Sequence, residues 1–170
     1  MMRLIKVMTA LILSVGVMNA YSQDGQTIIP KKNQLGVTIG GNGIGVSLHY
    51  GRSFLISSTR FMEVVVGIGS VPFAGGISVP HQITYNLGKN GNYLELGLGG
   101  TYWQGTDDAT ANQTSISSYQ IYPLVGYRKQ FRNHILLKAY INPFVHISGV
   151  HLYENNDIVP FWGLSIGYSF

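Results

Sequence analysis

His146 and Ser148 are the two residues best suited by type and spacing to chemistry, because a single residue separates them. An imidazole beside a serine hydroxyl can act as a general base and turn that hydroxyl into a nucleophile, provided that a third group orients the base. Glu154 or Asp157 could supply this third group. Among the five histidines only His146 and His151 lie near each other in sequence, and the pair is interpreted as solvated loop residues. The sequence therefore offers a candidate hydrolase pair, with no metal or cofactor expected.

The first residues have the layout of a secretory signal peptide. Arg3 and Lys6 precede an apolar run over residues 7–18, which is too short to span a bilayer. Ala20 and Ser22 then place small side chains three and one positions before a cut ahead of Gln23. We therefore expect a cleaved signal peptide over residues 1–22 and a periplasmic N-terminal segment over residues 23–33, with a retained membrane anchor as the alternative.

Composition limits the class of protein to which the rest of the chain can belong. Loss of the signal peptide would leave about 148 residues, which suits one domain. Cysteine is absent, so disulfides and thiol chemistry are excluded. No later segment approaches the roughly 18 consecutive apolar residues of a transmembrane helix. The net charge would fall from +4 to +2 without Arg3 and Lys6, and no compact basic patch indicates a nucleic-acid partner.

The last residues of the chain alternate strictly between large apolar and small side chains. Because neighbouring side chains of a strand point to opposite faces, one face of this segment is bulky and the other carries only Gly and Ser. The bulky face consists of Trp162, Leu164, Ile166, Tyr168 and Phe170. Seven earlier segments alternate in a similar way. They are Leu35–Gly40, Ile44–Gly51, Met62–Gly69, Ile77–Leu87, Leu94–Tyr102, Tyr119–Arg128 and Ile135–Asn142.

Eight such segments predict an all-β fold, an eight-stranded antiparallel up-and-down transmembrane β-barrel over residues 34–170. In lipid every backbone polar group must be paired, so the sheet has to close. The bore of such a barrel is just wide enough for side chains to fill it, and the Gly and Ser face provides the room. Pro80, Pro123 and Pro143 each remove a ladder donor, and bulges beside them could shift the register. Strict alternation places His81 on the lipid face. A soluble lipocalin-like barrel with the bulky face inside is the alternative fold.

If the N-terminus is periplasmic, the predicted periplasmic and external connections differ in length and in charge. The predicted periplasmic turns, Arg52–Arg60, Gly88–Gly91 and Lys129–Asn133, carry basic residues and no acidic ones. External loops are predicted around Asn42 and over Pro72–Gly75, Gln104–Ser117 and Val145–Ile158, and the two longest carry only acidic charges. Long external loops and short periplasmic turns are typical of outer-membrane barrels.

Four further charged residues point inward by the same alternation: Glu63, Glu95, Arg128 and Lys138. Charges in a narrow bore must be paired, because an isolated buried charge costs a large desolvation free energy. We therefore predict a lumenal salt-bridge network that plugs the barrel.

Three motifs, Leu94–Gly99, Gly126–Arg128 and Gly163–Phe170, together with the strand count, resemble small outer-membrane barrels of the OmpX and OmpA-transmembrane-domain type. The resemblance implies an outer-membrane location in a Gram-negative-type envelope, contact with its lipids and lipopolysaccharide, and recognition of the C-terminal strand by the barrel-assembly machinery. It covers the whole mature chain and includes no periplasmic peptidoglycan-binding domain.

The segment His146–Ser148 separately resembles the His-x-Ser motif of lipid A deacylase barrels, although Gly149 stands where those enzymes have Asn. The favoured function is non-enzymatic: a barrel with a side-chain-filled lumen that serves envelope integrity or surface interaction through its external loops. A deacylase-like hydrolase using His146 and Ser148, with Glu154 as a candidate third group, is the first alternative, and a narrow pore is the second. No oligomeric state is indicated.

Overall fold

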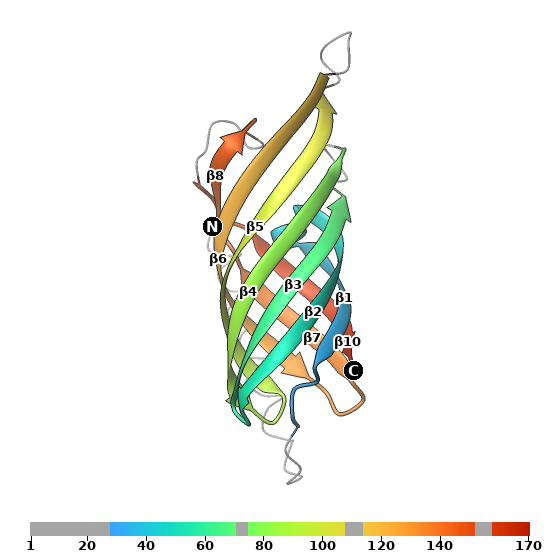
Figure 1. The fold of residues 1–170 in the computed structure, drawn as a ribbon, viewed down its shortest axis with the longest axis vertical. Helices are drawn as coiled ribbons and strands as arrows, with labels where there is room; N and C mark the ends of the chain where they lie inside the picture. Colours follow the sequence, from blue (N-terminus) through green and yellow to red (C-terminus); the bar gives the residue numbers. More distant parts are fainter. Residues whose placement is uncertain (1–27, 71–74, 108–113, 152–157) are drawn as a thin grey trace, which may run out of the picture.

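The computed structural model describes residues 28–70, 75–107, 114–151 and 158–170, which form one sheet closed into a barrel (Figure 1). Residues 1–27 lie outside the described part, so the structure leaves the predicted signal peptide untested. Among the described residues, no helix is long and apolar enough to cross a membrane. The elements are β1 (Asn33–Gly40), the 3-10 turn η2 (Gly41–Gly43), β2 (Gly45–Ser57), β3 (Arg60–Ser70), β4 (Ile77–Lys89), β5 (Asn92–Asp107), β6 (Thr114–Gln130), β7 (Ile135–Ile141), β8 (Phe144–Gly149), β9 (Ile158–Val159) and β10 (Trp162–Ser169).

Eight strands make up the closed ring, in the order β1-β2-β3-β4-β5-β6-β7-β10, and β10 pairs with β1 again. Every pairing is antiparallel and links neighbours in an up-and-down path. The two remaining strands prolong the wall: β8 pairs with β6 beyond β7, and β9 pairs with β8 beyond β10. The structure thus confirms the predicted eight-stranded barrel.

Prolines explain why two strands of the ring are each divided. Val125 pairs with Ile141, and four residues further along both strands Ile121 pairs with Val145, so Pro123 stands opposite Pro143. By the same reasoning from the β7–β10 and β8–β9 pairs, Pro160 stands on the other side of Pro143. A proline has no N–H to donate to the ladder. Three prolines at one level therefore confine the loss of hydrogen bonds to one row of the wall.

No bulge shifts the register at Pro80 or on the β5 side of Pro123, although the β3–β4 ladder lacks the two pairs between Val66–His81 and Gly69–Ser78. Pro80 pairs with Thr101 in a register that is constant along the whole β4–β5 pair. Pro123 pairs with Leu98 in an equally constant β5–β6 register. A bulge occurs elsewhere, in β8, where Gln120 faces His146 and Tyr119 faces Ser148, so that Ile147 is the extra residue.

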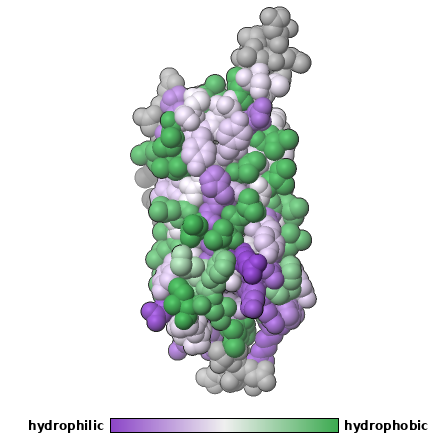
Figure 2. All heavy atoms as spheres, in the orientation of Figure 1, coloured by the Kyte–Doolittle hydropathy of each residue, from purple (hydrophilic) through white to green (hydrophobic). Residues whose placement is uncertain are grey.

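Side chains alternate between a buried inner face and an exposed outer face along the strands. The outer face is apolar: the bulky residues of the C-terminal strand and most of those of the other segments are exposed, and Leu98 is 71 % exposed. The buried side chains are mainly polar or charged, in the opposite sense to a water-soluble protein. Figure 2 shows apolar side chains spread over the wall of one face, with the most hydrophilic ones in its lower half. This distribution contradicts the lipocalin-like alternative, which needs the bulky face inside.

Several predicted connections are shorter than expected, because strands extend into them. β2 continues to Ser57, so the turn to β3 is only Ser58-Thr59. The predicted loop Gln104–Ser117 is largely the projecting ends of β5 and β6, which pair as far as Asp107 and Thr114. The predicted loop Val145–Ile158 begins as β8. Thr and Ser are frequent in the projecting ends of β5 and β6, which lack apolar alternation, so the sequence pattern did not reveal this extension.

Wall height varies around the ring. β1 and β10 have eight residues each, whereas β5 has 16 and β6 has 17. Beyond Gln104, β5 pairs only with β6, so this hairpin projects past its neighbours (Figure 1). The opposite end of the barrel carries the short turns and both ends of the described chain.

Candidate functional site

The four inward charges meet in the lumen. Glu63 on β3 is fully buried, and its carboxylate lies 2.5 Å from Arg128 Nη1 and 2.6 Å from Lys138 Nζ. Lys138 also contacts Glu95 at 3.2 Å, and Ser53 donates a hydrogen bond of 3.1 Å to Glu63. Arg128 and Lys138 are directly opposite each other on β6 and β7, so two like charges share the same carboxylate. Because it contacts both cations, Glu63 is the centre of the cluster.

This cluster crosses the bore. β3 and β7 are diametrically opposite in the ring of eight strands, so the Glu63–Lys138 ion pair joins opposite walls. The guanidinium of Arg128 also lies over the Phe61 ring, 4.8 Å from its centroid, and Phe61 in turn packs edge-on against Tyr93. Charged groups and aromatic rings therefore fill the lumen at this level, as expected for a barrel of this width.

Further along the bore, the turn η2 folds into the lumen. The Asn42 side chain accepts a hydrogen bond from the Tyr140 hydroxyl at 2.9 Å and donates one to Gln82 at 3.0 Å. The backbone carbonyl of Asn42 accepts a hydrogen bond of 2.5 Å from the Thr101 hydroxyl. The sequence prediction of an external hairpin around Asn42 is therefore wrong in its direction: the turn is tethered to three other strands inside the barrel.

The inward path of this turn depends on unusual backbone angles. Gly40 and Gly41 adopt φ of 71° and 56°, which glycine tolerates because it lacks a Cβ. Ile44 has φ of 63°, an outlier for a β-branched residue. Its buried side chain packs in the apolar cluster described next, and the bonds of Asn42 hold the turn from the other side. Surrounding contacts thus maintain a backbone that local preference disfavours.

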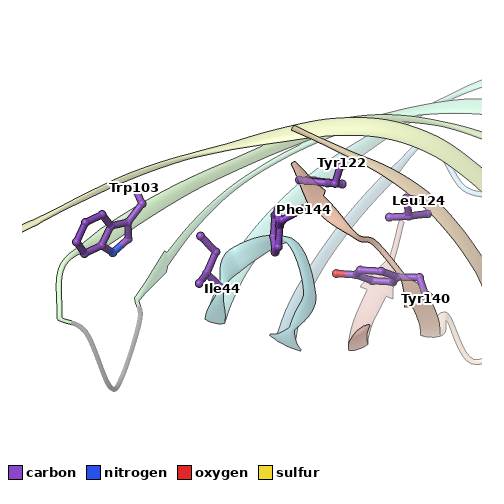
Figure 3. Close-up of a cluster of buried hydrophobic side chains, with 6 residues drawn as sticks. All are labelled: Ile44, Trp103, Tyr122, Leu124, Tyr140 and Phe144. Carbon is purple, nitrogen blue, oxygen red and sulfur yellow. The ribbon is translucent and has the colours of Figure 1, made fainter. Parts of the chain in front are cut away.

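An apolar cluster lies next to the turn and consists of Ile44, Trp103, Tyr122, Leu124, Tyr140 and Phe144 (Figure 3). The rings pack edge to face, with the Tyr122 and Phe144 centroids 5.2 Å apart. Phe161, next to Pro160 in the divided wall, packs on Phe144 at the same centroid separation of 5.2 Å. This packing fills the outer half of the lumen with aromatic rings contributed by several strands.

Small residues opposite Tyr140 are required by this packing. A Cβ built on Gly163 would come 2.5 Å from Tyr140 Cζ, so the ring would have to move. We expect Gly163→Ala to lower the free energy of unfolding by about 1–3 kcal/mol, the usual cost of overpacking. Urea titration of the folded protein measures the loss. In a Tyr140→Ala background the same substitution should cost little, and an equal cost in both backgrounds would contradict the proposed clash.

A third barrier lies at the end with the short turns, where residues Ile28–Lys32 cross the opening. The carbonyl of Ile28 accepts a hydrogen bond from Tyr93 at 3.1 Å, and that of Ile29 accepts one from Gln130 at 3.4 Å. On the other side, Lys32 accepts a bond of 2.7 Å from the Ser53 backbone. Pro30, between these contacts, is buried. The segment thus spans from β5 and β6 to β2 beneath the ion-pair cluster.

His146 and Ser148 do not form the hydrogen-bonded pair that nucleophilic catalysis needs. The bulge at Ile147 breaks their alternation: His146 is half-buried and Ser148 is exposed. The Nδ1 atom of His146 has no hydrogen-bond partner, and its ring instead packs on His151 with centroids 3.9 Å apart. In the described ranges no three metal-binding side chains converge. Glu154 and Asp157 lie outside the described residues.

Sequence reasoning missed the inward direction of the turn η2 and the crossing of the opening by Ile28–Lys32, because both depend on partners far away in the chain. Asn42 and Tyr140 are separated by 98 positions, and Ile29 and Gln130 by 101. The only local signal was the run Gly40-Gly41-Asn42-Gly43, which permits a sharp turn without fixing its direction.

Comparison with solved structures finds a similar fold in the crystal structure of the N-terminal β-barrel domain of Pseudomonas aeruginosa OprF. The TM-score is 0.60 with 12 % sequence identity, and the match covers 85 % of this chain and 100 % of that one. At this identity the likeness shows the fold alone, an eight-stranded barrel of the outer-membrane type. No protein-family model and no curated protein matches the chain.

Proposed function

We propose that this chain is a non-enzymatic outer-membrane β-barrel protein with a closed lumen, serving envelope integrity or surface interaction. The observation that carries the proposal is the inverted distribution of polarity in a closed ring: apolar side chains face outward and polar ones are buried. An apolar surface of this extent would aggregate in water, whereas hydrocarbon is its natural solvent. Closure supports the same location, because an open sheet edge cannot exist in lipid.

The closed lumen favours a structural or surface role over conduction. The ion-pair cluster, the inward-folded turn and the crossing segment each obstruct the bore at a different level. Surface interaction would fall to the β5–β6 hairpin, which projects beyond its neighbours at the end opposite the short turns. That end faces the cell exterior in the orientation we propose, with the N-terminus in the periplasm after signal-peptide cleavage.

Assembly in this membrane would use the C-terminal strand. Its outward side chains, Trp162, Leu164, Ile166, Tyr168 and Phe170, are all more than half exposed. The last residue also completes the ring, since Phe170 and Asn33 exchange two backbone hydrogen bonds of 2.9 Å. We propose that the barrel-assembly machinery recognises this bulky edge before it pairs with β1, and that lipopolysaccharide and phospholipids surround the finished wall.

A charge placed on the outer wall tests the membrane location. Leu98 lies near the middle of β5, and Leu98→Arg is expected to lower the free energy of unfolding in vesicles by about 2–4 kcal/mol, as for arginine at a bilayer midplane. Ile135, next to a short turn, provides the matched control: Ile135→Arg should cost about 0–1 kcal/mol. Urea titration in lipid vesicles gives both values. An exposed leucine of a water-soluble protein would tolerate arginine, so two neutral substitutions and a periplasmic location on fractionation would refute the proposal.

A further inference from the structure

The outer wall carries a group of cations at the end with the short turns. Arg52, Arg60 and Lys89 are exposed on the adjacent strands β2, β3 and β4, and Lys129 is half-exposed on β6. We call these four residues the basic girdle. Of the acidic residues in the described ranges, Glu63 and Glu95 are buried in the lumen and Asp107 ends β5 at the opposite end of the barrel. No acidic side chain among the described residues therefore neutralises the girdle.

The girdle stands among apolar and aromatic side chains. Arg52 lies between the exposed Tyr50 and Phe54 on the outward face of β2, with its guanidinium 5.9 Å from the centre of the Phe54 ring. Lys129 is 5.8 Å from the centre of the Phe131 ring. Arginine and lysine bury their aliphatic stems in apolar surroundings while their charged ends reach the polar boundary of a membrane. Aromatic rings mark the same boundary.

Among the described residues, the hydrogen-bond partners of Arg60 and Lys129 are neutral. Arg60 Nε donates to the Ser57 hydroxyl at 3.4 Å, and Lys129 Nζ donates to Asn92 Oδ1 at 2.6 Å. An anion nearby stabilises such a cation, because the boundary of the membrane screens charge less than bulk water does. The headgroup phosphates of the surrounding lipids lie at the depth of the girdle, and phosphate suits both guanidinium and ammonium groups.

We propose that the basic girdle binds the phosphate groups of anionic phospholipids in the leaflet on the side of the short turns. The inference rests on the proposed membrane location and adds a lipid class and a binding surface to it. Three adjacent strands present cations to the same leaflet, so one or a few lipids can contact more than one of them. The lipid shell on this side of the barrel is then enriched in negative charge relative to the bulk leaflet.

The test reconstitutes the full chain in vesicles of phosphatidylcholine alone and of phosphatidylcholine with a minor share of phosphatidylglycerol. Protease resistance reports insertion, and native mass spectrometry of the extracted protein reports which lipids stay bound. We expect phosphatidylglycerol to be enriched over its share in the vesicle. Its affinity relative to phosphatidylcholine should fall about fivefold for each cation removed in the series Arg52→Gln, Arg60→Gln and Lys89→Gln. Arg52→Lys with Arg60→Lys keeps the charge and should keep the enrichment.

The outcomes separate the inference from the proposed function. Insertion into both vesicles without enrichment, or with enrichment that survives the triple Gln variant, would overturn the lipid site and leave the membrane location intact. Failure to insert into either vesicle would overturn both. A triple variant that inserts less well is still informative, because the single Gln variants report the loss per cation in an otherwise unchanged barrel.

Discussion

Glu63→Gln is expected to lower the free energy of unfolding by about 3–5 kcal/mol, the cost of removing one partner from a buried ion cluster. The carboxylate of Glu63 is within 2.6 Å of both Arg128 and Lys138, and all three side chains are buried. The neutral amide would leave Arg128 without its carboxylate and Lys138 with only the 3.2 Å contact to Glu95. Urea titration of the protein in vesicles, followed by tryptophan fluorescence, measures the loss.

Glu95→Gln is the matched control for that experiment. Glu95 is equally buried, but its ion pair is a single contact to Lys138, so its loss should cost clearly less. Replacing Glu63, Glu95, Arg128 and Lys138 together by apolar residues of similar length should recover much of the stability, since no charge would then remain unpaired. Equal losses for Glu63→Gln and Glu95→Gln would contradict the central position of Glu63 in the cluster.

The second large effect is expected at Tyr140. Tyr140→Ala removes a buried ring that fills the space beside Gly41 and Gly163 and ends the bond to Asn42, so we expect a loss of about 3–5 kcal/mol. Tyr140→Phe keeps the ring and removes only the hydroxyl, which should cost about 0.5–1.5 kcal/mol. Comparing the two by urea titration separates packing from hydrogen bonding. A Phe variant as unstable as the Ala variant would show that the bond to Asn42, rather than the ring, holds the turn.

The face on which each strand residue lies was predictable, because side chains alternate between the inside and the outside with a period of two throughout the ring. Once the alternation of Leu94–Tyr102 and its counterparts is read as outside and inside, the inward side of Glu63, Glu95, Arg128 and Lys138 follows without knowledge of the register. The ion pairs that they form depend on which strands are opposite each other in the barrel. The strands close into a ring in the order of the sequence, and this order fixes which strands are opposite. The strand faces and the inward charges are therefore specified by an alternation that repeats over many residues.

Other parts were not predictable because they depend on single positions. One extra residue, Ile147, inverts the alternation in β8 and separates His146 from Ser148. The direction of the turn η2 depends on Tyr140 and Thr101, which lie on distant strands. The alignment of Pro123, Pro143 and Pro160 follows only from the register, since nothing in their spacing relates them.

The row of prolines also divides the barrel into units that differ in cooperativity. On the side of the short turns, each strand of the ring is paired with both of its neighbours, and the only register shift among the described pairs there is between Leu55 and Ser57 in β2. Beyond the row, β8 is joined to β6 by four residue pairs and to β9 by two. The free energy of local opening depends on how many contacts must break at once, so this outer part of the wall can open well before the rest. The shape of the exposed end can therefore fluctuate while the ring that closes the bore stays folded.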